Sequence, residues 1–321
     1  MLGEATKEPL SDADRAELGL PRTFRAVADP GVTQQLVFDP ATKQHNRSFR
    51  AGEPRFTDAG QAASWRQARR AAIVTVLTAI SGSPWAQHLV LRGSVLLKAW
   101  LGAVAREPGD LDFVVIPAHW DIGDSRSRQM LTGVAARAQQ ACAGSPVAID
   151  AGRAAVGGIW TYDRVPGLRM MLPWTADGGH SGDLQLDFVF NEHLPASAEP
   201  TAVSLSSDCP QALVLAVTPE LSLAWKVQWL ITDTYPQAKD LYDAVLLAER
   251  TPLRYDLLRQ VMTTADPASQ PITLADITSL DHIDFDAFRA DYPDLPAEEH
   301  DLIQRLAAAL QPTFAATPPA T

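Results

Sequence analysis

Cysteine is scarce in this sequence: the 321 residues contain two, Cys142 and Cys209, and neither has a histidine nearby at metal-ligand spacing. We therefore expect neither a disulfide scaffold nor a structural zinc site, and a reducing cytoplasm as the location. The N-terminal residues lack the apolar segment of a signal peptide. The richest apolar run, 71–80, is too short to cross a membrane, so no membrane partner is expected.

Positive charge is also limited, and the formal net charge of −11 argues against a protein that coats nucleic acid. Its distribution is uneven. Residues 43–70 contain seven basic and two acidic residues, whereas residues 251–321 contain four arginines and eleven carboxylates. An anionic partner would therefore have to bind the N-terminal third, although the arginines there are equally compatible with a solvated helix face.

The order of the expected elements divides the chain into a mixed α/β half and a helical half. Residues 1–56 are interrupted by proline and glycine and suggest short helical pieces. The expected helices lie at about 57–80, 95–101, 125–141, 218–232, 236–249, 252–263 and 297–310, and the expected strands at 88–91, 110–116, 147–149 and within 159–190.

This order predicts an α+β fold, with a mixed sheet in the first half and helices in the second. The expected divisions are an N-terminal helical extension (1–56), an α/β domain (57–210), a C-terminal helical domain (211–310) and a disordered tail (311–321).

Two carboxylates share one face of the expected strand DLDFVVI. Strand alternation puts Asp110 and Asp112 on the same side, with Cα atoms ~7 Å apart, and Leu111 and Phe113 on the other. Neighbouring carboxylates repel each other unless a cation lies between them. A solvent-facing strand end explains this short motif equally well.

A third carboxylate, Asp187, lies between Leu186 and Phe188 in the apolar strand DLQLDFVF. A carboxylate buried there is costly unless it is paired or binds a metal. If this strand lies beside DLDFVVI, then Asp110, Asp112 and Asp187 converge. Such a patch suits two Mg²⁺ or Mn²⁺ ions that act together with substrate phosphates.

The Gly93-Ser94 pair stands at an expected strand-to-helix junction before these aspartates. Glycine allows close approach of a phosphate, the following helix offers free N–H groups, and Ser94 adds a hydroxyl. An ordinary turn has the same two residues, so the order of the elements carries the inference.

Segments LVLRGSVLLKAWLG and REPGDLDFVV resemble the polymerase-β nucleotidyltransferase superfamily, and more narrowly the AbiEii/AbiGii toxins of type IV toxin–antitoxin systems. The resemblance covers roughly residues 88–249. It implies nucleotide binding by Gly93, Ser94 and Arg106. The chain departs from the family pattern at Arg92, where lysine is usual, at Ser94, where a second glycine is usual, and in LITDTYPQ, which lacks an arginine.

The helical half adds a second match, LSLAWKVQWL followed by PQAKDLYDAVLLAE. The resemblance implies that Lys226 contacts the nucleotide phosphates and that Asp240 lines the same cleft as a catalytic residue. Asp243, on the same helix face, is expected to support a neighbouring side chain. The alternative is a simple ion pair between Lys226 and Asp240 across two helices.

These features predict a metal-dependent nucleotidyltransferase that uses a nucleoside triphosphate and acts as a toxin. Asp110, Asp112, Asp187, Lys226 and Asp240 are its expected catalytic residues. The resemblance implies RNA, including tRNA 3′ ends, as acceptor and a cognate antitoxin as partner. Arg66, Arg69 and Arg70 are candidate RNA contacts.

Two other interpretations stay open. A small-molecule acceptor of the antibiotic type would suit the acidic C-terminal stretch from Asp281 to Asp301. A non-catalytic binding protein is the third possibility, and loss of one of the three carboxylates would have favoured it. All three are present.

Overall fold

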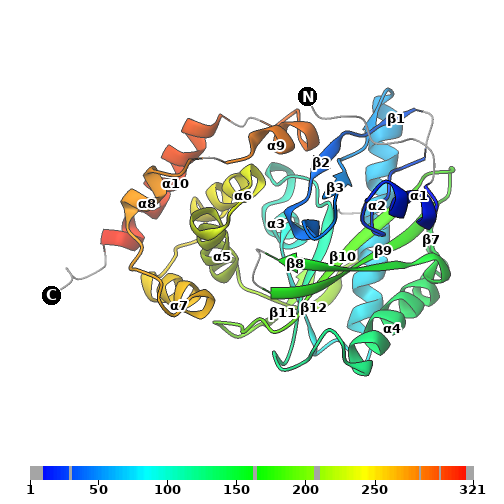
Figure 1. The fold of residues 1–321 in the computed structure, drawn as a ribbon, viewed down its shortest axis with the longest axis horizontal. Helices are drawn as coiled ribbons and strands as arrows, with labels where there is room; N and C mark the ends of the chain where they lie inside the picture. The colour runs from blue at the N-terminus through cyan, green and yellow to red at the C-terminus, as the bar shows by residue number, and fades with distance from the viewer. Residues whose placement is uncertain are drawn as a thin grey trace. The chain divides into compact units, whose positions relative to one another are not determined.

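The structure is a computed structural model that describes residues 10–28, 31–161, 165–205, 210–281, 283–295 and 298–315. The chain divides into two compact units. Unit 1 comprises residues 1–102, 107–192 and 200–216, and unit 2 comprises residues 103–106, 193–199 and 217–321. Figure 1 shows the helices and strands of both units.

An eight-stranded mixed sheet forms the centre of unit 1. Its strands are β5 (Leu89–Arg92), β6 (Asp110–Val115), β7 (Val147–Ile149), β8 (Ala155–Thr161), β9 (Val165–Ala176), β10 (Ser181–Val189), β11 (Glu199–Val203) and β12 (Ala212–Ala216). The order is β11-β12-β5-β6-β10-β9-β7, with β8 paired to β9. The predicted α+β class and mixed sheet are confirmed.

Strands β6 and β10 run parallel and pair with each other, so the condition for the convergence of their carboxylates is met. Their register places Asp187 beside Asp112 and Phe188 beside Phe113. The two phenylalanine rings stack with centroids 5.6 Å apart, on the face opposite the carboxylates. The apolar face of this strand pair thus anchors the sheet, while the other face carries its polar side chains.

Three longer helices of unit 1 follow the N-terminal segment: α2 (Ala59–Ser81), α3 (Ser94–Leu101) and α4 (Ser125–Ala141). The side chain of Asp58 caps α2 by accepting a hydrogen bond from the Gln61 amide at 2.7 Å. The buried face of α2 packs against α4 and the sheet (Figure 1). Trp65 on that face donates its indole N–H to the Ser181 carbonyl on β10 at 2.8 Å.

The described part of the N-terminal 56 residues contains more strand than the sequence pattern predicts. It has one α-helix, α1 (Asp12–Glu17), a 3₁₀-helix, η1 (Pro40–Thr42), and four short strands. The strands are β1 (Val32–Thr33), β2 (Leu36–Phe38), β3 (Phe49–Ala51) and β4 (Arg55–Phe56). The prolines break helices as expected, but the β-branched and aromatic residues between them pair as small antiparallel ribbons.

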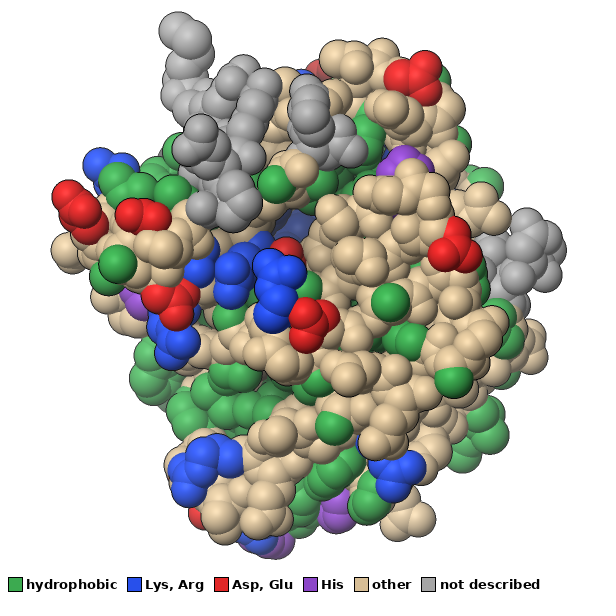
Figure 2. Space-filling view, turned by 90° about the vertical axis from the view of Figure 1, so that its right-hand side faces the viewer, with side chains coloured by type: hydrophobic (Ala, Val, Ile, Leu, Met, Phe, Trp, Pro, Cys, Tyr) green, Lys and Arg blue, Asp and Glu red, His purple; other side chains and the backbone are tan. Residues whose placement is uncertain are grey.

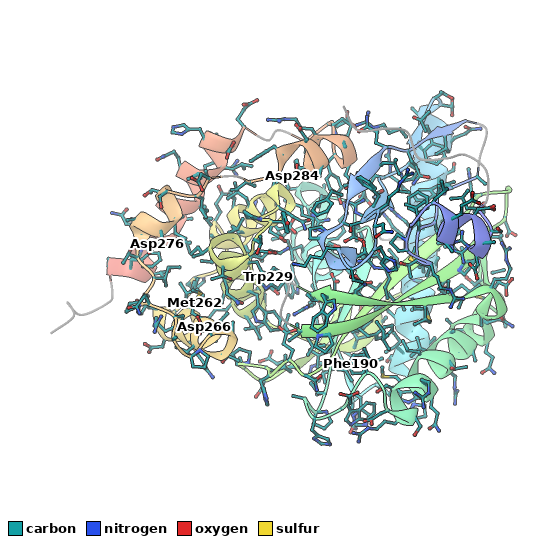
Figure 3. All side chains as sticks on the ribbon, viewed as in Figure 1. Phe190, Trp229, Met262, Asp266, Asp276 and Asp284 are labelled. Atoms are coloured by element: carbon teal, nitrogen blue, oxygen red, sulfur yellow. The ribbon has the colours of Figure 1, made fainter. Side chains whose placement is uncertain are left out.

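Unit 2 is helical. Its helices are α5 (Pro219–Thr232), α6 (Ala238–Ala248), α7 (Tyr255–Ala265), α8 (Leu274–Thr278), α9 (Phe285–Asp291) and α10 (Glu299–Ala315). Asp276 closes a capping box with Thr273 on α8, and Asp284 caps α9 through the Ala287 amide at 3.1 Å (Figure 3). These side chains satisfy helix N-termini that would otherwise leave free amides.

The last helix extends five residues into the segment expected to be a disordered tail. Helix α10 continues through Pro312 to Ala315. Thr313 is buried and donates its hydroxyl to the Leu253 carbonyl at 2.8 Å, which holds the final turn against the body of unit 2. Residues 316–321 lie outside the described residues.

Among the described residues, no helix combines the length and the apolar character needed to span a membrane.

Candidate active site

Asp110 and Asp112 lie on the same face of β6. Both side chains are half-buried, whereas Leu111 and Phe113 between and after them are fully buried. The strand therefore exposes its carboxylates on one side and fills the core with the other, as alternation predicts.

The Gly93-Ser94 turn contacts both carboxylates. Gly93 has φ 85° and begins helix α3, and a Cβ atom built on it would lie 2.4 Å from Oδ2 of Asp112. Ser94 is buried and donates its hydroxyl to Oδ1 of Asp110 at 3.2 Å. Only glycine fits a left-handed backbone this close to a carboxylate. The turn and the DxD strand therefore form one structural unit.

Replacement of Gly93 by alanine should lower activity by more than the backbone strain of an alanine at positive φ explains. The added methyl group would displace Asp112, and a misplacement of about 1 Å at a reacting centre can cost about 100-fold in rate. Gly102→Ala is the matched control, because Gly102 also has a positive φ, 62°, but a Cβ there would meet nothing within 4 Å. Comparable nucleotide-transfer rates for the two alanine variants would contradict the assignment.

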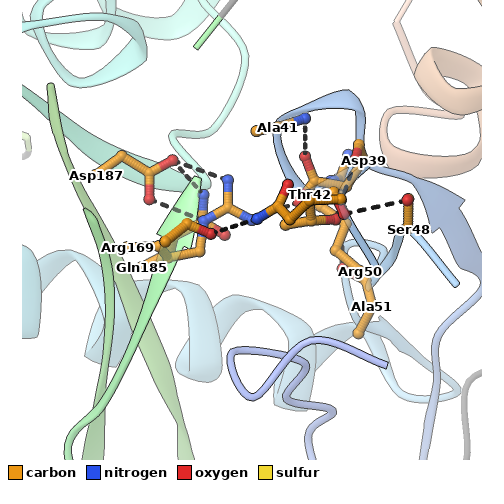
Figure 4. A network of polar contacts seen from close by, with 11 residues as sticks. Asp39, Ala41, Thr42, Ser48, Arg50, Ala51, Arg169, Gln185 and Asp187 are labelled. Carbon is orange, nitrogen blue, oxygen red and sulfur yellow. Dashed lines mark hydrogen bonds and ion pairs between the residues drawn. The ribbon is translucent and has the colours of Figure 1, made fainter. Parts of the chain in front are cut away.

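Asp187 is buried and bound by an arginine. Arg169, its register neighbour on β9, donates Nε to Oδ1 and Nη2 to Oδ2, both at 2.9 Å. Gln185 adds a third hydrogen bond to Oδ2 at 3.1 Å. The other end of the Arg169 guanidinium pairs with Asp39, which precedes η1 in the N-terminal segment (Figure 4). Arg169 thus connects the third carboxylate to Asp39, which lies 130 residues before the arginine in the sequence.

The electrostatics of this group follow from its burial. Burial raises the pKa of Asp187, and the charge of Asp110 adds to this rise, although Arg169 opposes both effects. Burial alone would lower the pKa of Arg169, but Asp187 and Asp39 raise it well above its ordinary value. Arg169 is therefore a permanent cation between two buried carboxylates.

The donor set fits Mg²⁺ at Asp110 and Asp112 better than it fits a complete three-carboxylate cage. Within the described ranges, no three His, Cys, Asp or Glu side chains are grouped as metal ligands. Asp187 is adjacent to Asp112 but its oxygens are turned to Arg169. Mg²⁺ commonly uses one or two carboxylates together with water and substrate phosphates, which matches the pair on β6.

A second polar cluster, wholly within unit 2, contains the remaining predicted site residues. Lys226 on α5 donates to Asp240 at 2.7 Å and to Asp243 at 2.9 Å, both on α6. Arg106 grips Asp243 through Nε and Nη2 at 3.1 and 2.9 Å, and its Nη1 donates to the Tyr292 hydroxyl at 2.8 Å. All four charged side chains are buried.

This cluster shows the ion pair between Lys226 and Asp240 that the sequence left as an alternative. It also confirms that Asp243 supports its neighbours, since it accepts from both cations. Burial lowers the pKa of Lys226, but Asp240 and Asp243 outweigh that effect and raise it. The phosphate contacts expected of Lys226 and Arg106 would thus have to compete with carboxylates already bound to them.

The three arginines expected to contact RNA differ in their surroundings. Arg66 is exposed on α2, whereas Arg69 is buried against Trp65 and pairs with Glu53 at 2.8 Å. Arg70 pairs with Glu107 at 2.5 Å. Two of the three positive charges are therefore balanced by carboxylates, and Arg66 is the one that faces solvent.

The Glu107 cluster makes a prediction about acid stability. Burial raises the pKa of Glu107, but hydrogen bonds from Arg70 and Lys98 overcome it and lower that pKa from 4.5 to about 2. The stabilisation is complete above the pKa that Glu107 has in the unfolded protein. It is lost as the pH falls towards the lower pKa of the folded protein. Urea unfolding at stepped pH should show Glu107→Gln less stable than wild type above pH 4.5, with the gap closing towards pH 2.

Glu17→Gln, which removes an exposed carboxylate from α1, is the control for net charge. If the difference in unfolding free energy between Glu107→Gln and wild type does not change with pH, packing rather than the ion pair causes the loss of stability.

Two residues of the polar group around Asp187, namely Arg169 and Asp39, were not predicted from the sequence. Arg169 is the one charged residue of the largely apolar strand β9, but nothing in the sequence marked it as the partner of Asp187. Asp39 is one of many acidic residues and has no local signal. The departure at Arg92 is also explained, because its guanidinium pairs with Glu192 at 2.8 Å.

Comparisons with known proteins bear on the fold and the family of this chain. No curated protein matches the sequence significantly. The fold is similar to that of MenT4, a nucleotidyltransferase toxin from Mycobacterium tuberculosis H37Rv, with a TM-score of 0.54 and 17% identity, covering 82% of this chain and 87% of that chain. At that identity the likeness establishes a shared fold.

The match to a protein family is more direct. Residues 75–316 match the model described as nucleotidyl transferase AbiEii toxin of type IV toxin–antitoxin systems. The match extends beyond the motifs from which the resemblance was inferred and covers most of both units. The chain therefore belongs to the AbiEii family of nucleotidyltransferase toxins.

Proposed function

We propose that the protein transfers a nucleoside monophosphate from a nucleoside triphosphate to a hydroxyl group of RNA, at a tRNA 3′ end, in a Mg²⁺-dependent reaction. The observation that carries the proposal is the contact of the Gly93-Ser94 turn with Asp110 and Asp112. It brings a phosphate-binding backbone and two metal-binding carboxylates together in one structural unit.

Asp110 and Asp112 are proposed to hold Mg²⁺, or Mn²⁺ in its place. The bound ion would neutralise charge that develops on the transferring phosphoryl group. Gly93 lets the triphosphate approach the backbone, and the first amides of α3 provide donors for its oxygens. The Ser94 hydroxyl orients Asp110 through its hydrogen bond.

Asp187 is proposed to act on the acceptor. It neighbours Asp112 in the sheet, where a carboxylate is in a position to accept the proton of an attacking hydroxyl. The Arg169 fork fixes its orientation and leaves it less available as a second metal ligand. Lys226 and Asp240 are assigned to phosphate contact and catalysis on the family resemblance, and Arg106 to nucleotide binding on the same ground.

The acceptor assignment rests on the toxin family and on the basic segment 43–70. Arg66 is the exposed arginine of the three candidates on α2, and we propose it as the RNA contact. Family membership also supports a cognate antitoxin as partner and action in the cytoplasm, where such RNA is found.

The test incubates purified protein with Mg²⁺, each α-³²P-labelled nucleoside triphosphate in turn, and either tRNA or total RNA. Label that enters tRNA with the wild-type protein but not with Asp112→Asn would support the proposal. The labelled triphosphate that gives this result would identify the nucleotide. Label in a small molecule of a cell extract, with none in RNA, would redirect the acceptor to the antibiotic type. No transfer to any acceptor would overturn the proposed reaction.

A further inference from the structure

A cavity of about 290 Å³, with both polar and apolar lining residues, lies in unit 1, away from the carboxylates of β6. One wall is the N-terminal segment from Leu10 to Ala28, and the other is formed by β7, η3 (Ala151–Arg153), β9 and the start of β10. Its lining residue Asp183 is four residues before Asp187 on β10, or ~13 Å along the strand. The cavity is therefore separate from the candidate active site.

Three arginines line this cavity: Arg15, Arg25 and Arg153. Figure 2 shows the face that carries α1 and β7, where basic side chains gather around a hollow. Asp150 and Asp183 are the acidic lining residues, so the wall has an excess of one positive charge. Like charges brought together in a half-buried site repel each other unless an anion lies among them.

Several polar atoms of the lining are buried and unused. Among the described residues, Nε of Arg15, Nε of Arg25 and Nε1 of Trp174 have no hydrogen-bond partner. Arg15 and Trp174 are 4% and 1% exposed. The other two guanidinium nitrogens of Arg15 donate hydrogen bonds to the Leu10 carbonyl at 2.5 Å and to Asp12 at 2.7 Å. These contacts fix the guanidinium in place. Buried donors without partners are uncommon in folded proteins, where an ordered water or a bound ligand is the usual acceptor.

One acceptor is also unused. Oδ1 of Asp183 is buried and has no partner within the described part of the chain. Burial raises the pKa of Asp183 in spite of the nearby Arg25, and burial together with Arg15 lowers the pKa of Arg25. Burial is the largest cause of both shifts, and the attraction between Arg25 and Asp183 only partly offsets it. Phe24, Pro173 and the Trp174 ring supply apolar surface beside them.

We propose that this cavity binds a small organic anion that has a carboxylate or phosphate group and, close to it, a hydroxyl or amino group. The anionic group accepts hydrogen bonds from Arg25, Arg15 and Trp174, and the hydroxyl or amino group donates to Asp183. The volume is at the lower limit of ligand pockets, which suits a compact molecule. This site goes beyond the transfer reaction and does not depend on it.

The N-terminal segment supplies one wall of the proposed site. Arg15, Arg25 and Phe24 precede residue 75, where the family match begins, and seven of the seventeen lining residues lie outside the matched segment. A ligand in the cavity would join this segment to β9 and β10 by contacts with both walls.

The test measures binding by isothermal titration calorimetry to the full-length protein. The two probes are glycerol 3-phosphate and phenylalanine, which separate a phosphate ligand from a carboxylate ligand. Glycerol and phenylalaninamide are the comparators that lack the anionic group. Arg25→Gln and Arg153→Gln each remove one lining charge, and Arg22→Gln is the matched control, because Arg22 is 65% exposed in its side chain and does not line the cavity.

Saturable binding of one anion is expected, with no binding of its comparator. Each lining variant should weaken it about tenfold or more, and Arg22→Gln should leave it unchanged. Thermal unfolding shows whether a variant that binds weakly is still folded. Arg25 makes no hydrogen bond within the described part of the chain, so Arg25→Gln should fold as well as wild type. No saturable binding of either anion, or equal weakening by Arg22→Gln, would show a cavity filled by water alone.

Discussion

Asp112→Asn is expected to lower nucleotide transfer by about a thousandfold or more while the protein stays folded. Asparagine has the same shape but no charge, so it is a poor ligand for Mg²⁺. A metal ion contributes several kcal/mol to charge stabilisation in such transfers, and each ~1.4 kcal/mol corresponds to a tenfold change in rate. The half-buried position of Asp112 and its contact with the Gly93 turn make it the residue whose loss should cost most. Initial rates of label transfer at saturating Mg²⁺ measure the effect.

Asp58→Asn is the matched control for this experiment. It makes the same chemical change in the same unit, at the N-cap of α2, where asparagine caps as well as aspartate. Transfer by this variant should stay within about twofold of wild type, since surface substitutions of this kind are nearly neutral. If Asp112→Asn keeps a tenth of the wild-type rate, the β6 pair does not hold the essential metal.

The strands that carry these carboxylates were predictable because their signals are local. Alternation placed Asp110 and Asp112 on one face, and the apolar neighbours of Asp187 marked its strand as buried. The contact between the two strands needed one further inference, that three costly carboxylates are grouped for a reason. The parallel register of Asp112 with Asp187 confirms that the two strands lie side by side.

The partners of these residues were not predictable, because they come from distant segments whose local sequence is ordinary. Arg169 reaches Asp39 across 130 residues, and Arg106 reaches Asp243 across 137. Strands β11 and β12 were missed for a similar reason. They are short, five residues each, and β12 is recognisable only by its parallel pairing with β5. Tertiary contacts decide such elements more than propensity does.

Asp243→Ala is expected to destabilise unit 2 by about 3–5 kcal/mol, because it leaves two buried cations without a shared partner. Asp243 is fully buried and accepts from both Arg106 and Lys226. Although burial raises its pKa, these two cations more than compensate and lower it below its ordinary value of 3.8. The stabilisation is therefore present above that value and is lost as the pH falls below it. Denaturant unfolding near neutral pH measures its full size.

The matched control, Asp286→Ala, removes an exposed carboxylate of the same unit, whose side chain is 88% exposed and lies 3.8 Å from Arg289. Its effect should stay within about 0.5 kcal/mol.

A second variant separates structure from function. Asp240→Asn leaves Lys226 bound to Asp243, so stability should change less than in Asp243→Ala. If Asp240→Asn folds normally but loses transfer, Asp240 is catalytic as the family resemblance implies. If both stability and transfer stay unchanged, the Lys226–Asp240 contact is an ordinary ion pair between two helices, and the catalytic assignment of Asp240 fails.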